Sequence, residues 1–591
     1  MRTTDLVHSQ NKLKKLVDLG ISLSAERDIN KLLENILLGA KFLSHADAGT
    51  LYLRTKKETL QFIILTTDSL GIAMGGVGKP PVFMPEVPLY KSNGEANHQN
   101  IATHAALTGE TIVIADAYDS NLYDFSGVLR FDQTTGYRST SFLTVPLKPR
   151  QGKVIGVIQL INALDPTTGK VVPFDSDVIG FVEALAAQVA ITLDNQLLLQ
   201  AQKDLFDAFI RLIASAIDAK SPYTGGHCER VPELAKLLAQ AVCASGHDAF
   251  ANFSMSEDEH YEMRIASWLH DCGKVTTPEY VVDKATKLEG INNRIHEVRM
   301  RFEVLHRDAE IACLKAILAD SQATEQLEKE RANLQSALQE EFAFIARSNV
   351  GGEFMNAADK ERIRQIAQRT WIRHFDNRLG LSYAELKRKG ADDGTDSSIE
   401  TLLADKPEHI IIRERDTNKR DTELNIQMPA PEHLYNMGEI YNLCIERGTL
   451  NAEERYKINE HVVQTLAMLE NLPFPDGMDR VPEFAGAHHE TMLGTGYPRK
   501  LKREEMSIPA RIMAIADVFE ALTATDRPYK EPKTLNQAIK IMSFMKKDGH
   551  IDPDLFEIFL SEGVFQQYAE KFLEPFQIDF VDIGQYVTKK S

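Results

Sequence analysis

Two kinds of hydrophobic spacing alternate along the first part of the chain. Apolar residues recur every three or four positions over residues 10–45, which predicts helix. Residues 49–65 instead alternate between apolar and polar around a Lys-Lys-Glu turn, which predicts a β-hairpin. Further strands are expected at residues 111–117, 139–148 and 153–163. The N-terminal part is therefore expected to be an α+β domain with an antiparallel sheet and flanking helices.

Residues 178–220 return to helical spacing over a much longer stretch. The stripe consists of Phe181, Leu185, Val189, Leu193, Leu197, Leu205, Leu212 and Ile217. Spacings near 3.5 to 4 residues are typical of a seam for a partner helix, which favours a parallel dimer joining a sensor to an output domain. The alternative is a helix that packs on its own domain.

Composition narrows the class of protein. The chain has 591 residues, is 43% hydrophobic and carries a formal charge of −18, which suggests two to four domains and argues against binding to polymeric nucleic acid or anionic membranes. Its five cysteines form no CxxC pair, which favours a reducing, cytoplasmic location. No uninterrupted apolar run approaches 18 residues, so no membrane span is expected.

The segment FDQTTGYRSTSFLTVPL at residues 131–147 resembles the phosphodiesterase type of GAF domain, a cytosolic small-ligand sensor. Asn162, Phe174 and Asp177 match the signature of that type, whereas Ala163 and Val178 depart from it. The resemblance implies a small-molecule ligand. A cyclic nucleotide, a different ligand and a purely dimerising role all remain open.

Seven residues in the second part of the chain have the side chains of a metal centre. Each lies in or beside an apolar helical stretch, and the set comprises His227, His270, Asp271, His461, His488, His489 and Asp517. An adjacent His-Asp pair suits two cations, because the carboxylate can bridge them. Five imidazoles and two carboxylates favour two first-row transition metals over Mg²⁺ or Ca²⁺ alone.

The order of these motifs, with HDxxK at 270–274 and HHExxxGTGYP at 488–498, resembles the HD-GYP family of cyclic di-GMP phosphodiesterases. The resemblance implies an all-α HD-type domain that holds two divalent metals, with Fe or Mn preferred to Ni or Zn. One metal would be held by His227, His270 and Asp517, and the other by His461, His488 and His489. Asp271 would bridge them.

The same resemblance assigns residues to the substrate. It implies that Lys274 contacts the scissile phosphate, that Tyr497 lines the substrate groove, and that Arg527 and Lys530 hold phosphate groups. The sequence departs from the family at two positions, Ser221 and Tyr223, where many members carry Asp and three-metal members carry Glu. A site with two metals, and without a third, is therefore expected.

A long insertion is expected inside this domain. His461 follows His270 by far more residues than in the family, so residues 287–447 are interpreted as a largely helical insert. The expected domains are a GAF domain at 1–180, a linker helix at 181–220 and an HD-GYP domain at 205–590. His296, near the start of the insert, is a rival to His461 as a metal ligand.

The resemblance implies hydrolysis of cyclic di-GMP to linear pGpG, and further to GMP, under control of the GAF domain. Two alternatives stay open. The chain could be an inactive cyclic-dinucleotide sensor or scaffold, or an HD phosphohydrolase for another nucleotide or cyclic dinucleotide. The implied partners are the cyclic dinucleotide, a GAF ligand, a second copy of the chain and diguanylate cyclases of the GGDEF type.

Overall fold

The chain divides into two compact units, Met1–Asp207 and Ala208–Ser591. The structure is a computed structural model. It describes residues 28–149, 152–220, 226–352, 354–390, 398–413, 418–525 and 532–587. The helix predicted at residues 10–45 is therefore described only from residue 28 onward, as α2 (Ile29–Ser44), and Asp28 caps its first turn through its side chain.

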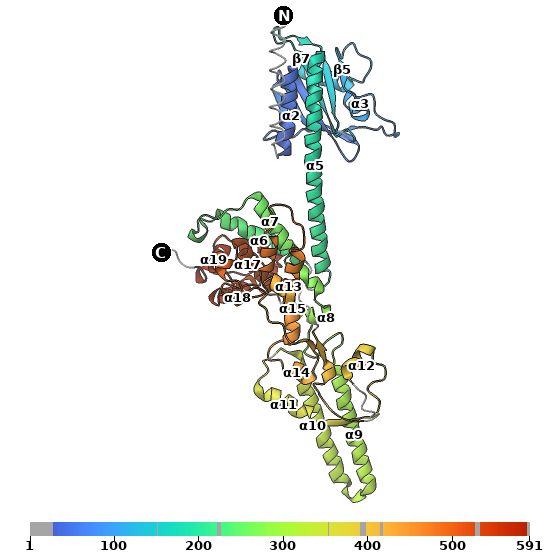
Figure 1. Cartoon of the computed structure of the whole chain (residues 1–591), viewed down its shortest axis with the longest axis vertical. Helices are drawn as coiled ribbons and strands as arrows, with labels where there is room; N and C mark the ends of the chain where they lie inside the picture. The colour runs from blue at the N-terminus through green and yellow to red at the C-terminus, as the bar shows by residue number, and fades with distance from the viewer. Residues whose placement is uncertain are drawn as a thin grey trace. The chain divides into compact units, whose positions relative to one another are not determined.

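An antiparallel sheet forms the centre of the N-terminal unit (Figure 1). Its strands lie in the order β3-β2-β1-β7-β6-β5, with β4 beside β2 and β8 beside β7. Their bounds are β1 Ala46–Arg54, β2 Thr59–Thr67, β3 Ile72–Met74, β4 Val87–Pro88, β5 Ile112–Ile114, β6 Phe142–Leu147, β7 Gly156–Leu164 and β8 Val171–Val172. The predicted hairpin is β1 with β2, and the three further predicted strands contain β5, β6 and β7.

Helices cover both faces of this sheet. On one face, α2 and the first half of α5 (Ser176–Asp218) enclose a core that includes Leu37, Leu160 and Val189. The other face packs on α3 (Ile101–Thr108), next to α4 (Ser126–Thr135). Neighbouring residues of β7 contribute to different cores, because successive side chains of a strand point to opposite faces of the sheet. The predicted α+β fold is confirmed.

Helix α5 contains two differently placed apolar sets. The predicted dimer seam includes Leu185, Val189 and Leu193, which are buried in the core of the N-terminal unit. The first half of α5 therefore packs on its own domain, as the alternative prediction had it. Farther along, Leu205 and Leu212 are 58% and 63% exposed. By length and composition alone α5 would be able to cross a membrane, and it is the one described helix for which this holds.

The C-terminal unit contains a helical bundle. Its elements are α6 His227–Ala244, α7 Glu257–Leu269, η2 Cys272–Thr276, α8 Glu279–Val282, α15 Ala452–Leu469, α16 Val481–Gly486, α17 Ile508–Thr523, α18 Leu535–Lys547, α19 Pro553–Ser561 and α20 Val564–Phe572. α6 packs against α7 and α17, and α15 packs against η2. These three contacts bring the motif-bearing elements together.

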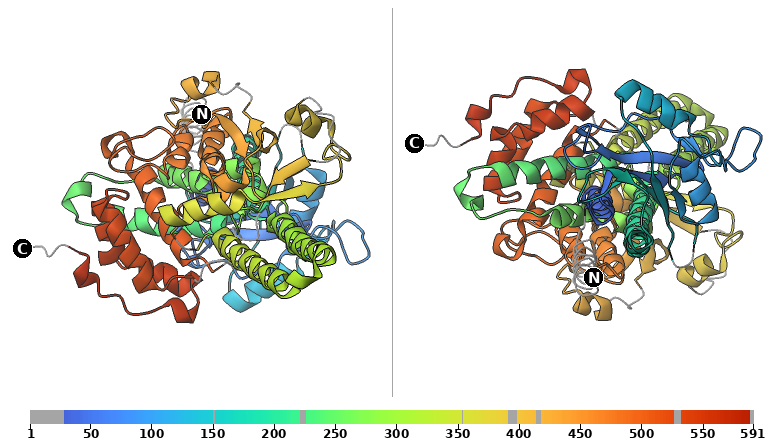
Figure 2. Two further views of the ribbon diagram at one scale, coloured as in Figure 1. Left: turned by 90° about the horizontal axis from the view of Figure 1, so that it is seen from below. Right: turned by 90° about the horizontal axis from the view of Figure 1, so that it is seen from above.

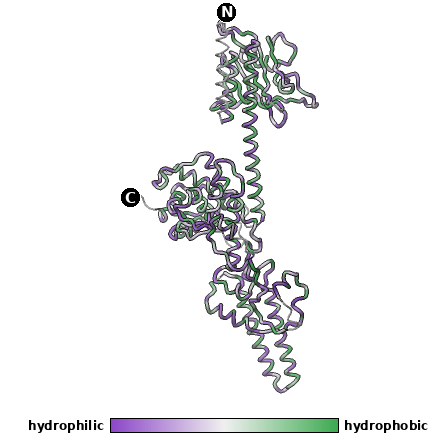
Figure 3. Tube along the Cα trace, viewed as in Figure 1, coloured by the Kyte–Doolittle hydropathy of each residue, from purple (hydrophilic) through white to green (hydrophobic). Residues whose placement is uncertain are grey.

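A second part of the C-terminal unit lies within residues 287–447, where the insert was predicted. Its helices α9 (Ile295–Ala319) and α10 (Thr324–Val350) run side by side as an antiparallel hairpin (Figures 1 and 2). Hydrophobic and hydrophilic positions are mixed along both helices (Figure 3). The remaining elements are α11 Ala357–Ala367, β9 Thr370–Arg373, α12 Tyr383–Lys389, β10 Ser398–Thr401, β11 Ile410–Ile412, α13 Asn418–Glu423, β12 His433–Asn436 and α14 Glu439–Leu443.

The two ends of this part of the chain meet. The Lys287 ammonium is buried and donates to the carbonyls of Leu443 and Ile445, at 3.0 and 2.7 Å. A separate core inside it includes Phe302 and Ile345. Joined ends and a separate core support the proposal of an insertion, although its exact bounds remain a prediction.

Candidate metal centre

The end of α7 is fixed against α15 by a close backbone approach. The Gly273 N–H donates to the Thr465 hydroxyl at 3.0 Å, and that hydroxyl donates to the His270 carbonyl at 3.1 Å. A Cβ atom at Gly273 would lie 1.9 Å from the His461 carbonyl oxygen, so only glycine fits there. The His270–Asp271 pair is thereby held beside the helix that carries His461.

The first group of donor atoms surrounds the Nε2 atoms of His227 and His270, which lie 3.2 Å apart. His227 Nε2 lies 3.2 Å from Asp271 Oδ2 and 3.4 Å from Asp517 Oδ1. Two donors on one transition metal, at bonds of about 2.0–2.1 Å, are separated by roughly 3–3.4 Å. The spacing of these atoms is therefore that of ligands to one cation.

The second group consists of His461, His488 and His489, whose candidate ligand atoms lie within 4.8 Å of one another. The Nδ1 atoms of His461 and His488 each lie 2.6 Å from the carbonyl oxygen three residues earlier, of Ile458 and Ala485. These contacts fix Nδ1 as the protonated nitrogen and leave the Nε2 lone pair free, as a metal ligand requires.

The Asp271 carboxylate lies between the two groups. Its Oδ2 atom faces His227 and His270 at 3.2 and 3.4 Å, whereas its Oδ1 atom faces His461 and His488 at 3.2 and 3.9 Å. The Lys274 ammonium also reaches Oδ2, at 2.6 Å. One carboxylate thus presents a different oxygen to each group, which is the arrangement expected of a bridging ligand.

The electrostatics differ between the two groups. Burial lowers the pKa of His227, but the carboxylates of Glu520 and Asp271 outweigh it and raise that pKa to about 10. Burial and the nearby His270 imidazole lower the pKa of His488 to about 3, and burial and His488 lower the pKa of His489. His488 and His489 therefore stay neutral, in the state that binds metal.

The charged groups beside His227 are strongly coupled. Burial raises the pKa of Asp271, yet the Lys274 ammonium and His270 hold it well below its usual range. The pKa of Asp517 is also lowered, because contacts with His270 and His227 outweigh burial. Burial alone would lower the pKa of Lys274, but the Asp271 carboxylate raises it. Both carboxylates are therefore ionised and able to bind a cation.

Sequence reasoning missed two residues behind the first group. Glu520 Oε2 lies 2.5 Å from His227 Nδ1, and Glu520 Oε1 accepts a hydrogen bond of 2.7 Å from Arg230. Glu520 is almost fully buried and stands one helical turn after Asp517 on α17. That three-residue spacing, which places both carboxylates on one face of an apolar helix, was the available signal.

The GYP loop is held by another residue that received no role. The buried Glu490 carboxylate accepts hydrogen bonds from the backbone N–H groups of Arg499 and Leu501, at 2.6 and 3.0 Å. Within this loop the Tyr497 ring stacks on the His489 imidazole, with ring centroids 4.9 Å apart. The Tyr497–Pro498 peptide is cis. Tyr497 thus lies at the edge of the second group.

The structure brings together all seven predicted metal-ligand residues and Lys274, and it places the rival His296 elsewhere. His296 is exposed on α9, with its Nδ1 atom 2.7 Å from the Arg299 guanidinium. The predicted phosphate-holding residues Arg527 and Lys530, like the departures Ser221 and Tyr223, lie outside the described residues.

Both groups fit a divalent transition metal. The Nε2 atoms of His461 and His488 are buried and have no hydrogen-bond partner among the residues that the structure describes, which is costly unless a cation takes their lone pairs. The first group combines two imidazoles with two carboxylate oxygens, a donor set that suits Fe, Mn, Ni or Zn. Two candidate metal-binding groups therefore share one carboxylate.

Comparison with known families agrees with this geometry. The model of the GAF domain matches residues 28–193, and a model of the HD domain matches residues 397–555. The chain carries a GAF domain and an HD domain. The resemblance to GAF-containing HD-GYP phosphodiesterases is thereby confirmed. The match to the HD domain includes His461, His488, His489 and Asp517, but it does not reach the His270–Asp271 pair on the far side of the insert.

Characterised relatives match only part of the chain. The 3'3'-cGAMP-specific phosphodiesterase 1 of Vibrio cholerae is 33% identical over 158 residues, covering 26% of this chain and 35% of that protein. A cyclic di-GMP phosphodiesterase of Thermotoga maritima is 33% identical over 136 residues, covering 23% and 36%. This chain thus spans about a third of the length of these relatives.

Among solved structures, the GAF domain of a phosphoenolpyruvate-protein phosphotransferase from Coxiella burnetii is similar to part of this chain. It is 16% identical, covers 32% of this chain and 98% of that one, and has a TM-score of 0.25.

Proposed function

We propose that this chain is a metal-dependent phosphodiesterase that opens the ring of a cyclic dinucleotide. The observation that carries the proposal is the position of Asp271, whose two carboxylate oxygens face two separate histidine groups. The Lys274 ammonium lies 2.6 Å from one of these oxygens, Oδ2. When bound, two divalent cations would supply an activated water and neutralise charge on a phosphodiester.

The chain's own residues have distinct roles in this proposal. His227, His270 and Asp517 hold one cation, His461, His488 and His489 hold the other, and Asp271 bridges them. The Lys274 side chain is 29% exposed, so its ammonium can reach a substrate phosphate as well as Asp271, and it would stabilise charge that develops on phosphoryl oxygens. Tyr497 would line the groove and orient a base, as its stacked position beside His489 permits.

The metals and the substrate are proposed at a finer level. Fe or Mn is preferred, with Ni or Zn as alternatives, because imidazole and carboxylate donors suit all four. Cyclic di-GMP, hydrolysed to pGpG and further to GMP, is the first candidate substrate. 3'3'-cGAMP is the second, because one of the similar proteins is a 3'3'-cGAMP-specific phosphodiesterase.

Regulation by the GAF domain is part of the same proposal. This domain contains a pocket of about 840 Å³, whose lining includes Tyr52, Arg130 and Tyr137, and a small molecule bound there would be the signal.

Helix α5 carries a stripe of apolar residues at seven-residue intervals that are 39–63% exposed: Ile191, Leu198, Leu205 and Leu212. That period suits a second copy of α5, which supports a homodimer. An interaction with diguanylate cyclases of the GGDEF type would bring hydrolysis of the cyclic dinucleotide close to its synthesis.

The decisive experiment compares hydrolysis with metal content. The full chain, purified without oxygen, is incubated with cyclic di-GMP and separately with 3'3'-cGAMP, with added Mn²⁺ or Fe²⁺. We expect about two metals per chain and a linear product. Lys274→Ala should retain both metals but lose about 100- to 1,000-fold in rate, because it removes a charge that acts on the phosphoryl oxygens.

The matched control is Lys315→Ala, which removes an exposed lysine from the distant α9 hairpin and should leave the rate unchanged. Bound metals and tight nucleotide binding without any product would instead support the sensor or scaffold. Hydrolysis of mononucleotides but of neither cyclic dinucleotide would favour the other class of HD phosphohydrolase.

A further inference from the structure

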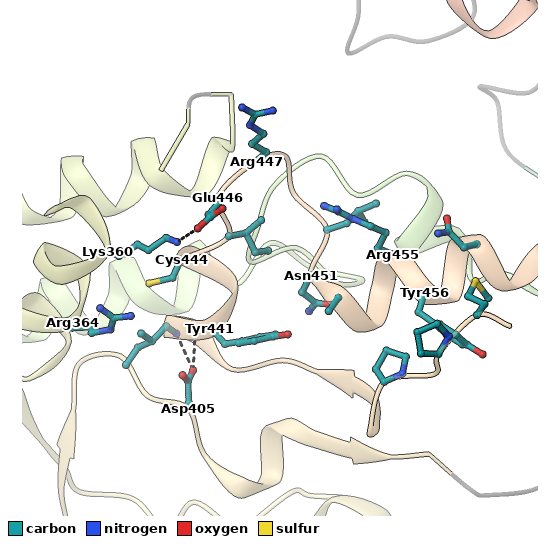
Figure 4. Close-up of a pocket in the computed structure, with 18 residues that line it drawn as sticks. Lys360, Arg364, Asp405, Tyr441, Cys444, Glu446, Arg447, Asn451, Arg455 and Tyr456 are labelled. Carbon is teal, nitrogen blue, oxygen red and sulfur yellow. Dashed lines mark hydrogen bonds and ion pairs between the residues drawn. The ribbon is translucent and has the colours of Figure 1, made fainter. Parts of the chain in front are cut away.

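A pocket of about 940 Å³ lies between the insert and α15 (Figure 4). The insert contributes residues of α11, of the segment 428–431 and of α14, while α15 contributes Arg455, Tyr456 and Asn459. No residue named in the metal centre lines it. Its size is within the range of small-molecule sites.

The pocket has an excess of positive charge in an acidic chain. Four cations and two carboxylates line it: Lys360, Arg364, Arg447, Arg455, Asp405 and Glu446. Lys360 pairs with Glu446 at 2.6 Å, and Asp405 accepts backbone hydrogen bonds from Ile440 and Tyr441 at 3.0 and 3.2 Å. Both carboxylates are thus already engaged, and three arginines remain.

These three arginines are poorly neutralised. Arg364 has one ion pair, with Glu361 at 3.5 Å, and the Arg447 guanidinium lies over the Phe354 ring at 5.6 Å. Arg455 is exposed, and its side chain has no ion pair or hydrogen bond with any residue that the structure describes. Guanidinium groups with few carboxylate partners favour phosphate, which they bind through paired N–H donors.

The pocket also has a surface for a planar ring. Tyr441 is 37% exposed and lies between Arg364 and Arg455, and its hydroxyl is fixed by Glu453 at 3.0 Å (Figure 4). Pro429 and Pro431 add rigid apolar surface. A tyrosine with a fixed hydroxyl and an open ring face can stack on a nucleobase, because every base has a π-face.

We propose that this pocket binds a nucleotide with two or more phosphates as a ligand distinct from the substrate. The phosphates would lie against Arg364, Arg447 and Arg455, and the base against Tyr441. The site belongs to the junction with the insert, because α11 and residues 428–431 supply much of its wall.

Two paths, one along helix α15 and one through hydrogen bonds, lead from this pocket to the metal centre. Arg455 stands six residues before His461 on the same helix, α15. On the other side, the wall residue Met428 follows Gln427, whose N–H donates to the Pro498 carbonyl of the GYP loop at 2.8 Å. The Arg499 guanidinium also donates to the Leu424 carbonyl, at 2.9 Å. A ligand in the pocket would therefore act on His461 and Tyr497 together.

The test is calorimetric titration of the full chain with GTP, and with inorganic pyrophosphate as the probe without a base. We expect GTP to bind more tightly than pyrophosphate, and Arg455→Ala to weaken GTP binding by about tenfold or more, since it removes charged hydrogen bonds. Arg455→Lys should recover only part of the affinity, because lysine lacks the planar fork. Arg307→Ala, an exposed arginine on α9, is the matched control and should bind GTP normally.

Three results would overturn this inference: no GTP binding at millimolar concentration, binding unchanged by Arg455→Ala, or equal affinity for GTP and pyrophosphate. Only the effect on hydrolysis rests on the proposed function. GTP should also change hydrogen exchange in residues 424–431 and 495–499, a readout that needs no turnover. A chain that hydrolyses no cyclic dinucleotide but shows both effects would refute the proposed function and keep this site.

Discussion

The two histidine groups that share Asp271 have different surroundings. Around His227 and His270 the structure gathers carboxylates, with Asp517 facing the Nε2 atoms and Glu520 behind His227. Around His461 and His488, in the part of the chain that the structure describes, Asp271 is the one carboxylate at ion-pair distance. The Nδ1 atoms there meet neutral carbonyls instead.

This difference predicts unequal affinity for cations. Anionic ligands and an anionic group behind an imidazole make the first group more electron-rich, so it should retain its cation more firmly. The second group offers three imidazoles and one oxygen of Asp271, and it should exchange its cation more readily. Substitutions at and around Asp271 test this difference in cation affinity.

The largest effect is expected from Asp271→Ala, which removes the shared ligand. Both groups lose an oxygen, so metal content should fall at both and hydrolysis should fall by more than about 100-fold, beyond what loss of an outer partner costs. Metal analysis and product formation measure this. Asp258→Ala, at an exposed position on the preceding helix α7, is the control. Full retention of two metals would refute the bridging role.

His461→Ala should remove one cation and leave the other. It deletes an inner ligand of the second group alone, so metal content should fall from about two to about one per chain while activity falls by more than about 100-fold. His296→Ala should change neither quantity, because His296 is exposed on α9. Equal metal content in the purified His461→Ala variant would contradict the assignment.

Gly273→Ala should separate the two groups without removing a ligand. The new Cβ would lie 1.9 Å from the His461 carbonyl and 2.6 Å from the Thr465 nitrogen, so η2 must move away from α15. Overpacking of this kind destabilises the folded protein by about 1–3 kcal/mol, which should appear as a lower Tm. The Asp271 carboxylate should then no longer bridge the two histidine groups. Gly290→Ala, whose Cβ would meet open space, should leave Tm nearly unchanged.

The smallest effect is expected from Glu520→Gln. The amide keeps the shape but loses the charge behind His227, so affinity of the first group should fall by about tenfold while the second group is unaffected. Competition with a chelator, followed by metal analysis, measures each group. Glu562→Gln, at an exposed position after α19, is the control. An equal loss of metal affinity at both groups would contradict the proposed electrostatic difference between them.

Much of the fold and the site was accessible from sequence because the signals are local. The strands of the GAF domain follow a period of two, and His488 and His489 stand in one short motif. Glu520 was missed because its role depends on His227, almost 300 residues earlier, and no local pattern shows that contact. The small sheets β9–β10 and β11–β12 were also not foreseen, since the surrounding sequence is charged and without clear alternation.

The dimer seam shows another limit of periodicity. Leu185 and Leu205 belong to one apolar stripe in the sequence, yet one is buried in the GAF core and the other is exposed. A helical period reports an apolar face but does not identify what covers it. Tertiary structure decides that separately for each part of the helix.

The hydrogen bond between Gly273 and Thr465 spans 192 residues. At about 5–20 residues per second, roughly 10–40 seconds of protein synthesis separate these two positions. Until His461 is made, a growing chain has His227, His270 and Asp271 but none of the second histidine group. Cation pairing must therefore wait until the ribosome has made the insert, α15 and the residues up to Asp517, so a fully loaded centre marks a chain whose long-range assembly is complete.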